Sequence, residues 1–152
     1  MCLASDISGA TTMHKRIAGV RMEQAELSMK RGDYKAAQTA LEEANEIITS
    51  YSENSADFAY LTSKFATMYY FRGDYAEAIT ALNKTNELYE QVFSGEQDYS
   101  LNVCIMLAEC YENMQDGEKA LQAWQKAYEI ADNSLVPDHP TMKKIICHLN
   151  EM

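Results

Sequence analysis

The chain has 152 residues, of which 47% are hydrophobic and 24% charged, and its formal net charge is −10. This length supports one domain with a continuous core. The acidic balance argues against binding to nucleic acid or anionic membrane surfaces, because both need clustered Lys and Arg. No segment approaches the ~20 apolar residues of a membrane helix, and residues 1–10 contain no stretch long enough for a signal peptide.

The first predicted elements are a flexible lead and a pair of helices. Residues 1 to about 11 are rich in Ser, Ala and Gly and are expected to be flexible, with Thr11 or Thr12 capping the first helix. That helix is expected to end near Lys30, before a break at Gly32. Its partner is predicted at about 34–51, followed by polar residues at 52–55.

The same arrangement is predicted twice more. Helices are expected at about 56–71 and 75–93, and again at about 98–114 and 117–133, with a polar segment at 94–97 between these pairs. Pro140 then begins a last helix that runs to the C-terminus, because proline has a suitable φ and its missing N–H is not needed there.

A short motif recurs with a fixed period. Arg31-Gly32-Asp33-Tyr34 returns as Arg72-Gly73-Asp74-Tyr75, a step of 41 positions (32 to 73). The segment after each motif returns a third time at 118–124, a step of 42 positions (78 to 120). Such a period predicts stacked units, none of which can bury its apolar face alone. Aligned columns expected in the core are Ala25, Ala66 and Ala108; Ala37, Ala78 and Ala120; and Leu41, Leu82 and Trp124.

This pattern resembles the tetratricopeptide repeat, a helix–turn–helix unit, over residues 17–152. The longer period is similar to that of kinesin light chain repeats, in which a His-Pro dipeptide often begins the first helix. Here only the last copy matches, with His139-Pro140, whereas the two earlier copies have Ser55-Ala56 and Gln97-Asp98. The third unit departs from the pattern at Gln115, which replaces glycine, and at Gly117, which replaces tyrosine. The resemblance implies an all-α, right-handed α-solenoid of three helix pairs and a closing helix. The domain is expected to span 12–152, with repeats at about 14–53, 55–94 and 97–134 and the closing helix at 140–152.

The closing helix is expected to protect one end of the solenoid. Terminal units need a solvated outer face. Alternatively, the chain is a fragment of a longer array. The residues predicted to form the solvated face are Lys143, Lys144, His148 and Glu151.

No motif for catalysis is present: GxSxG, a Gly-rich phosphate loop and HExxH are all missing from the sequence. His148 follows Cys147 directly, and adjacent helical side chains point apart, which makes them a poor metal pair. We therefore expect that the protein is not an enzyme and that it has neither a cofactor nor a metal site. Free thiols in a cytoplasmic protein are expected at Cys2, Cys104, Cys110 and Cys147, since none has CxxC spacing.

The resemblance also implies where a ligand would bind. In tetratricopeptide arrays the first helix of each pair lines a concave surface, and exposed apolar side chains there have no packing role unless something covers them. The alternative is that a terminal arm or a self-contact covers them. The implied ligand-facing residues are Gly19, Met22, Glu26 and Met29 in the first repeat, Tyr60, Ser63, Thr67 and Tyr70 in the second, and Asn102, Ile105, Glu109 and Glu112 in the third.

These columns contain no Lys or Arg. Co-chaperones of the family hold the carboxylate tail of heat-shock chaperones with Lys, Arg and Asn, and a buried carboxylate without a cation is costly. The same argument disfavours the acidic peptides of the kinesin type. Glu26, Glu109 and Glu112 instead favour a ligand with Lys or Arg beside apolar anchors, and Glu109 and Glu112 are expected to lie in water.

The sequence thus predicts a protein-interaction scaffold or adaptor that binds a peptide or helix of a partner protein in its concave groove. Two other functions stay open. One is a self-associating structural module, in which solenoid ends stack on another copy, and the other is a regulatory interaction subunit of an enzyme complex. The expected partners are proteins, with neither nucleic acid nor membrane among them.

Overall fold

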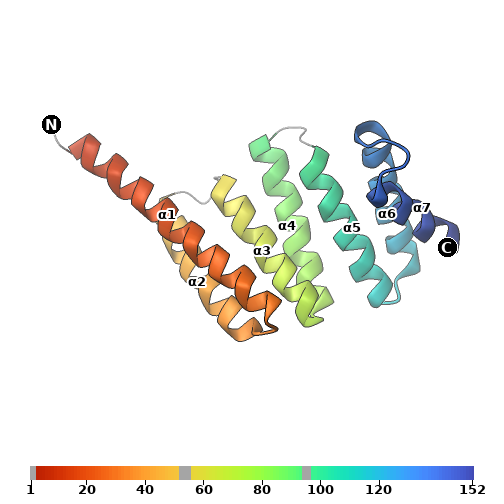
Figure 1. The fold of residues 1–152 in the computed structure, drawn as a ribbon, viewed down its shortest axis with the longest axis horizontal. Coiled ribbons are helices and arrows are strands. Elements are labelled where there is room, and N and C mark those ends of the chain that lie inside the picture. Colours follow the sequence, from red (N-terminus) through yellow and green to blue (C-terminus); the bar gives the residue numbers. More distant parts are fainter. Residues whose placement is uncertain (1–2, 52–55, 94–96) are drawn as a thin grey trace.

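The computed structural model describes residues 3–51, 56–93 and 97–152, with side chains described for 12–51, 56–92 and 101–152. The separator predicted at 52–55 lies outside these ranges, as do Cys2 and residues 94–96 of the separator predicted at 94–97, whose last residue, Gln97, belongs to a helix. Within them the chain forms helices alone (Figure 1). The helices are α1 (Leu3–Lys30), α2 (Tyr34–Thr49), α3 (Ala56–Arg72), α4 (Tyr75–Phe93), α5 (Gln97–Asn113), α6 (Gly117–Ser134) and α7 (Pro140–Glu151).

The helix boundaries agree with the sequence to within two residues everywhere except at the N-terminus. There α1 begins at Leu3. The prediction of a flexible lead through residue 11 is therefore wrong for residues 3–11, which are helical. The segment contains no proline, and its alanines sustain a helix that one glycine, Gly9, is not enough to break. The predicted start of α7 is confirmed, with His139 as its N-cap and Pro140 in the first turn.

The turns inside the three pairs share one hydrogen-bond pattern. The N–H of Asp33, Asp74 and Asp116 each donates to a carbonyl five residues earlier, at 2.9 Å in all three turns. This Schellman arrangement needs a left-handed residue just before the aspartate. Gly32 and Gly73 meet that need with φ of 77° and 89°, and Gln115 adopts φ 60° although it is not glycine.

The columns predicted from the repeat form the core. Ala25, Ala66 and Ala108 have no exposed surface, and the same holds for Trp124, which fills the large column of the third pair. Neighbouring pairs share apolar clusters, so the core runs from α1 to α7 without a gap. The close helix crossings therefore depend on alanine at these positions.

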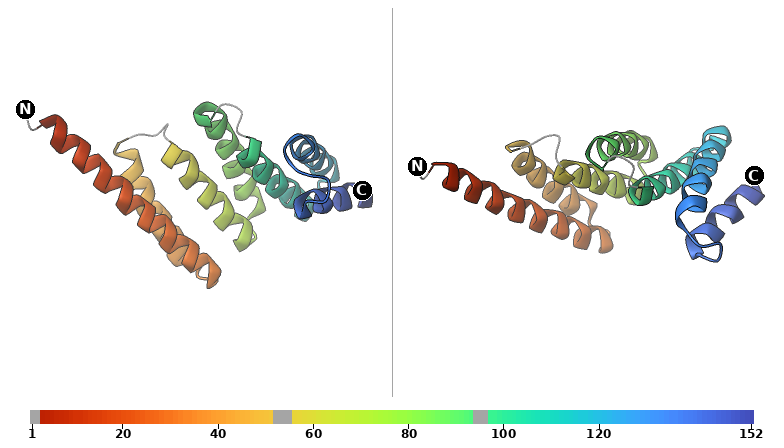
Figure 2. Two further views of the ribbon diagram at one scale, coloured as in Figure 1. Left: turned by 45° about the horizontal axis from the view of Figure 1, so that its top comes forward. Right: turned by 90° about the horizontal axis from the view of Figure 1, so that it is seen from above.

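The three pairs stack side by side from α1 to α6, and α7 packs on α6 at the C-terminal end (Figures 1 and 2). Each helix packs chiefly on its pair partner, while α2 and α1 meet α3, and α4 meets α5. The predicted all-α solenoid of three helix pairs and a closing helix is confirmed. Its stacking places α1, α3 and α5, which carry the predicted ligand-facing residues, in successive layers.

Candidate functional site

Three of the predicted ligand-facing residues are core residues. Met22, Met29 and Ile105 are only 6%, 9% and 9% exposed. The two methionines pack with α2 and α3, and Ile105 packs with α6 and α7. The expectation that they lie exposed in a groove is wrong, because these long side chains reach the seams between neighbouring helices. Met29 alone still contributes to a surface hollow.

A charged pair connects α1 and α3 in the predicted groove. Lys64 Nζ forms an ion pair with Glu26 and lies 4.7 Å from the centroid of the Tyr60 ring. Partial burial lowers the pKa of Lys64, but hydrogen bonds to Glu26 and Tyr60 outweigh that effect and raise it overall. The repeat columns missed Lys64, although it stands one helical turn after Tyr60, where such a contact is expected.

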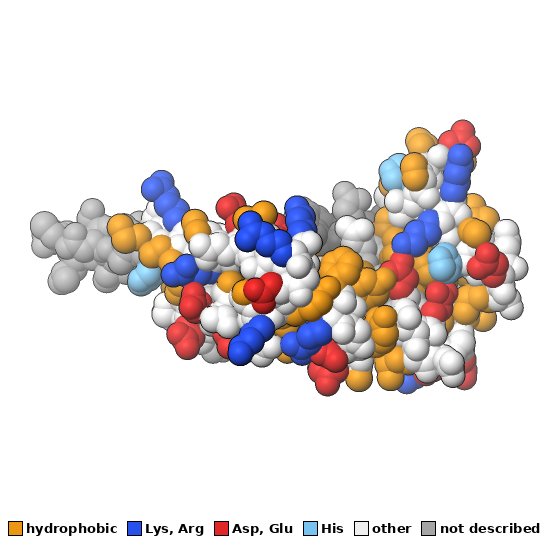
Figure 3. All heavy atoms as spheres, turned by 60° about the horizontal axis from the view of Figure 1, so that its bottom comes forward, with side chains coloured by type: hydrophobic (Ala, Val, Ile, Leu, Met, Phe, Trp, Pro, Cys, Tyr) orange, Lys and Arg blue, Asp and Glu red, His pale blue; other side chains and the backbone are white. Residues whose placement is uncertain are grey.

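Beside this pair, a pocket of about 410 Å³ opens between the C-terminal parts of α1 and α3. Its base is apolar, and Phe71 at its edge is 58% exposed. Figure 3 shows the molecule from the side of the three tight turns, with apolar side chains emerging between charged ones. We refer to this pocket as the open groove; its lining residues are Glu26, Met29, Lys30, Thr67 and Phe71.

The hydroxyl groups near the open groove are used within α3. Ser63 Oγ donates to the Tyr60 carbonyl at 2.6 Å, and Thr67 Oγ1 donates to the Ser63 carbonyl at 2.9 Å. The donor of each hydroxyl is therefore satisfied without a ligand. The Thr67 methyl group is left to contribute apolar surface to the open groove.

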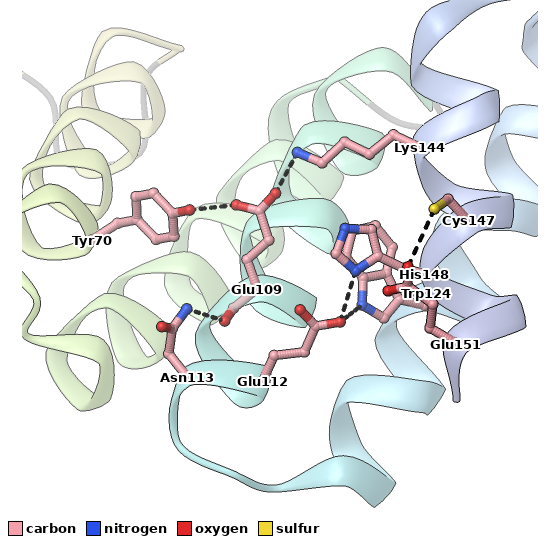
Figure 4. A network of polar contacts seen from close by, with 9 residues as sticks. All are labelled: Tyr70, Glu109, Glu112, Asn113, Trp124, Lys144, Cys147, His148 and Glu151. Carbon is pink, nitrogen blue, oxygen red and sulfur yellow. Dashed lines mark hydrogen bonds and ion pairs between the residues drawn. The ribbon is translucent and has the colours of Figure 1, made fainter.

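Tyr70 connects the second repeat to the third (Figure 4). Its hydroxyl donates to Glu109 Oε2 at 2.5 Å, and burial together with this bond raises the pKa of Tyr70. The other Glu109 oxygen forms an ion pair with Lys144 of α7. The Glu109 side chain is only 17% exposed, so it does not lie in water as expected.

Glu112 is also engaged by the closing helix. Its Oε1 accepts a hydrogen bond from Trp124 Nε1 at 2.6 Å and lies 3.0 Å from His148 Nδ1. The sequence placed Lys144 and His148 on a solvated outer face. Lys144 is indeed 47% exposed, although its amine reaches back to Glu109, whereas the His148 side chain is only 29% exposed and turns onto Glu112. At the third repeat, α7 therefore lies against two of the predicted groove residues, Glu109 and Glu112 (Figure 4).

The predicted site thus divides into two parts. The open groove of the first two repeats keeps accessible apolar surface, while α7 covers Glu109 and Glu112 in the third. Asn102, the remaining predicted residue of that repeat, is exposed on α5. No described group of His, Cys, Asp and Glu side chains has the arrangement of a metal site. None of the described helices is long and apolar enough to cross a membrane.

Comparison with known proteins supports the same reading of the fold. Residues 57–130 match the family model described as tetratricopeptide repeat. The N-terminal domain of stress-induced protein-1 (STI-1) from C. elegans is structurally similar, with a TM-score of 0.68 and 13% sequence identity over 90% of this chain and 97% of that one. At this identity the likeness concerns the fold alone. A comparison with curated proteins gives no significant match.

Proposed function

Because the chain is a tetratricopeptide repeat protein, with a fold that serves protein–protein interaction, we propose that its open groove binds an apolar segment of a partner protein. The observation that carries the proposal is the pocket of about 410 Å³ with Phe71 exposed at its edge. A large exposed aromatic side chain beside a concave apolar surface is typical of an interaction site.

The charges of the groove define the ligand further. Glu109 and Glu112 already have basic partners in α7, so they contribute little to recognition while α7 stays in place. Glu26 is shared with Lys64 and keeps 40% of its side chain exposed. The proposed ligand is therefore a helix or extended peptide with one large apolar anchor, and with a Lys or Arg near Glu26 as a secondary contact.

Selection from a random peptide library displayed on phage, with the intact chain as bait, tests this proposal. Enriched peptides are synthesised and their affinities measured by fluorescence anisotropy. We expect them to share an aromatic or large aliphatic residue, and we expect Phe71→Ser to weaken binding by about tenfold or more, since buried aromatic contacts usually dominate an interface. Glu26→Gln is expected to reduce affinity less, and chiefly at low salt.

Gln125→Ser, on the exposed side of α6, is the matched control and is expected to bind as the wild type does. Circular dichroism of each variant establishes that the fold is retained. Enriched peptides that bind Phe71→Ser as tightly as the wild type would move the site away from the open groove. The cytoplasmic location remains a prediction of the sequence.

A further inference from the structure

The N-terminal helix carries a second apolar surface, distinct from the open groove. Among the α1 side chains that the structure describes, four large apolar ones are exposed: Met13 by 63%, Ile17 by 39%, Val20 by 50% and Leu27 by 52%. With Gln24 between the last two, they follow each other at alternating steps of four and three residues. This spacing places them on one face of a helix, in the pattern of a coiled-coil seam. We call these five residues the α1 stripe.

The α1 stripe lies opposite the face that holds α1 in the fold. Within the part of α1 whose side chains are described, the buried residues are Ala18, Met22, Ala25 and Met29. At about 100° per residue, their mean direction is roughly half a turn from that of the stripe. None of the helices that the structure describes covers this outer side, which forms the N-terminal edge of the stack (Figures 1 and 2). The stripe is therefore an unpartnered apolar face on a long, well-anchored helix.

A hollow adjoins the stripe where α1 meets α2. It has a volume of about 660 Å³, and the stripe residues Gln24 and Leu27 line it together with side chains of α2 such as Ala36 and Ala40. The surface next to the stripe is thus concave, and it has room for side chains from another helix.

We propose that the α1 stripe is an interface between two copies of this chain, with the two α1 helices packed antiparallel about a twofold axis. One patch then serves both partners, as a twofold interface requires. Ile17 of each copy packs against Val20 of the other. Met13 of one copy faces Gln24 and the hollow beside Leu27 of the other. This packing covers the apolar stripe and fills the concave surface next to it.

Charges beside the stripe select this arrangement. Arg16 and Glu23 flank it on one side, and neither forms an ion pair with another described side chain. In the antiparallel pair with Ile17 on Val20, Arg16 of each copy meets Glu23 of the other, which gives two symmetric ion pairs. A parallel pair would bring Arg16 next to Arg21 of the other copy instead. Like charges across such a seam disfavour that orientation.

Sedimentation equilibrium of the full chain at several concentrations tests the interface. We expect the wild type to form a reversible dimer. The single substitutions Arg16→Glu and Glu23→Arg are each expected to raise the dissociation constant of the dimer about tenfold. The variant with both substitutions exchanges the two charges and is expected to dimerise as the wild type does. A merely structural effect of either substitution would not be reversed by the other.

A polar substitution in the stripe provides the second arm. Val20→Asp is expected to give a monomer with an unchanged circular dichroism spectrum, because Val20 is half exposed in the single chain. Val136→Asp, at a residue 65% exposed between α6 and α7, is the matched control and is expected to remain dimeric.

A wild type that stays monomeric at every concentration would overturn the proposal, and so would a dimer that Val20→Asp leaves intact. This interface and the open groove are tested separately. Val20→Asp is expected to leave the affinity of the selected peptides unchanged, and Phe71→Ser is expected to leave the dimer unchanged.

Discussion

The imidazole of His148 lies on the indole of Trp124, with ring centroids 4.2 Å apart and planes 17° from parallel. Both rings also bond to one oxygen atom, Glu112 Oε1. Trp124 belongs to α6, His148 to α7 and Glu112 to α5, so a single carboxylate connects three helices. The indole is fully buried, which makes this acceptor essential to it.

Replacement of Glu112 is therefore expected to affect stability. Glu112→Leu leaves the buried Trp124 N–H without an acceptor and should lower the free energy of unfolding by about 1–3 kcal/mol. Glu112→Gln keeps an acceptor and should cost less. Urea unfolding followed by Trp124 fluorescence measures both, and Glu129→Leu on the exposed side of α6 is the control. Equal stability of Glu112→Leu and the wild type would contradict the role given to this carboxylate.

The third turn has a conformation that suits glycine better than glutamine. Gln115 has φ 60°, and a left-handed residue with a side chain costs about 1–2 kcal/mol. A glycine at this position would avoid that cost, but part of the gain in stability would be lost because glycine has greater conformational freedom in the unfolded chain. Gln115→Gly is expected to raise the free energy of unfolding by about 0.5–1 kcal/mol, as measured by thermal and urea melts.

The reverse substitution at the second turn tests the same argument. A Cβ at Gly73 would meet no atom within 4 Å, so Gly73→Ala carries only the conformational cost and should destabilise by about 1 kcal/mol. If the two substitutions changed stability in the same direction, φ would not be the cause.

The alanine columns are expected to tolerate no larger side chain. Ala66 is fully buried where α3 crosses its neighbours, and Ala66→Leu should overpack this crossing at a cost of about 1–3 kcal/mol. Gln125→Leu adds a similar side chain at an exposed site of α6 and should cost little. Thermal melts that show equal tolerance of both would contradict the alignment of the repeats.

The thiols are expected to differ in reactivity. Cys147 is exposed, but the neighbouring Glu151 carboxylate, 3.6 Å from its sulfur, raises the pKa of the thiol and so disfavours the reactive thiolate. Glu151→Gln removes that charge. It should lower the pKa, speed alkylation of Cys147 at neutral pH and move the rate–pH curve to lower pH.

Mass spectrometry of the peptides after timed iodoacetamide treatment measures these rates. Cys110 is the internal control, since burial raises its pKa to about 11 and it should react slowly in both proteins. High salt should narrow the difference between Glu151→Gln and the wild type. An unchanged rate at Cys147 would show that the carboxylate does not act on the thiol.

The fold could be predicted because each repeat carries its own signals. The breaks at Gly32 and Gly73 mark the helix ends, and the alanine columns mark the positions where helices cross. These signals recur along the chain, so each copy supports the prediction made from the others. At the N-terminus, only composition was available. It suggested flexibility for a segment that has no helix-breaking proline and in fact continues α1 to Leu3.

The candidate site could be predicted only in part, because groove columns describe direction and not what lies opposite. Lys144 and His148 reach Glu109 and Glu112 from positions 35 and 36 residues further along the chain. No local pattern pairs residues at that separation. The burial of Met22 and Met29, whose long side chains fill the seams between helices, is likewise decided by tertiary packing and not by their place on the helix.

Each helix contacts its neighbours in the stack. The cooperativity of unfolding between two helix pairs is therefore expected to decrease with their separation along the stack. The α1–α2 pair has another pair on one side only, whereas α5–α6 is enclosed by α4 and by α7. In an isolated chain, amide hydrogen exchange should therefore be fastest at α1–α2 and slowest in the central helices, because units at an open end can unfold by themselves. A molecule of this kind has a stability that varies along its length, and a second copy bound at α1 would protect the very helices that otherwise open first.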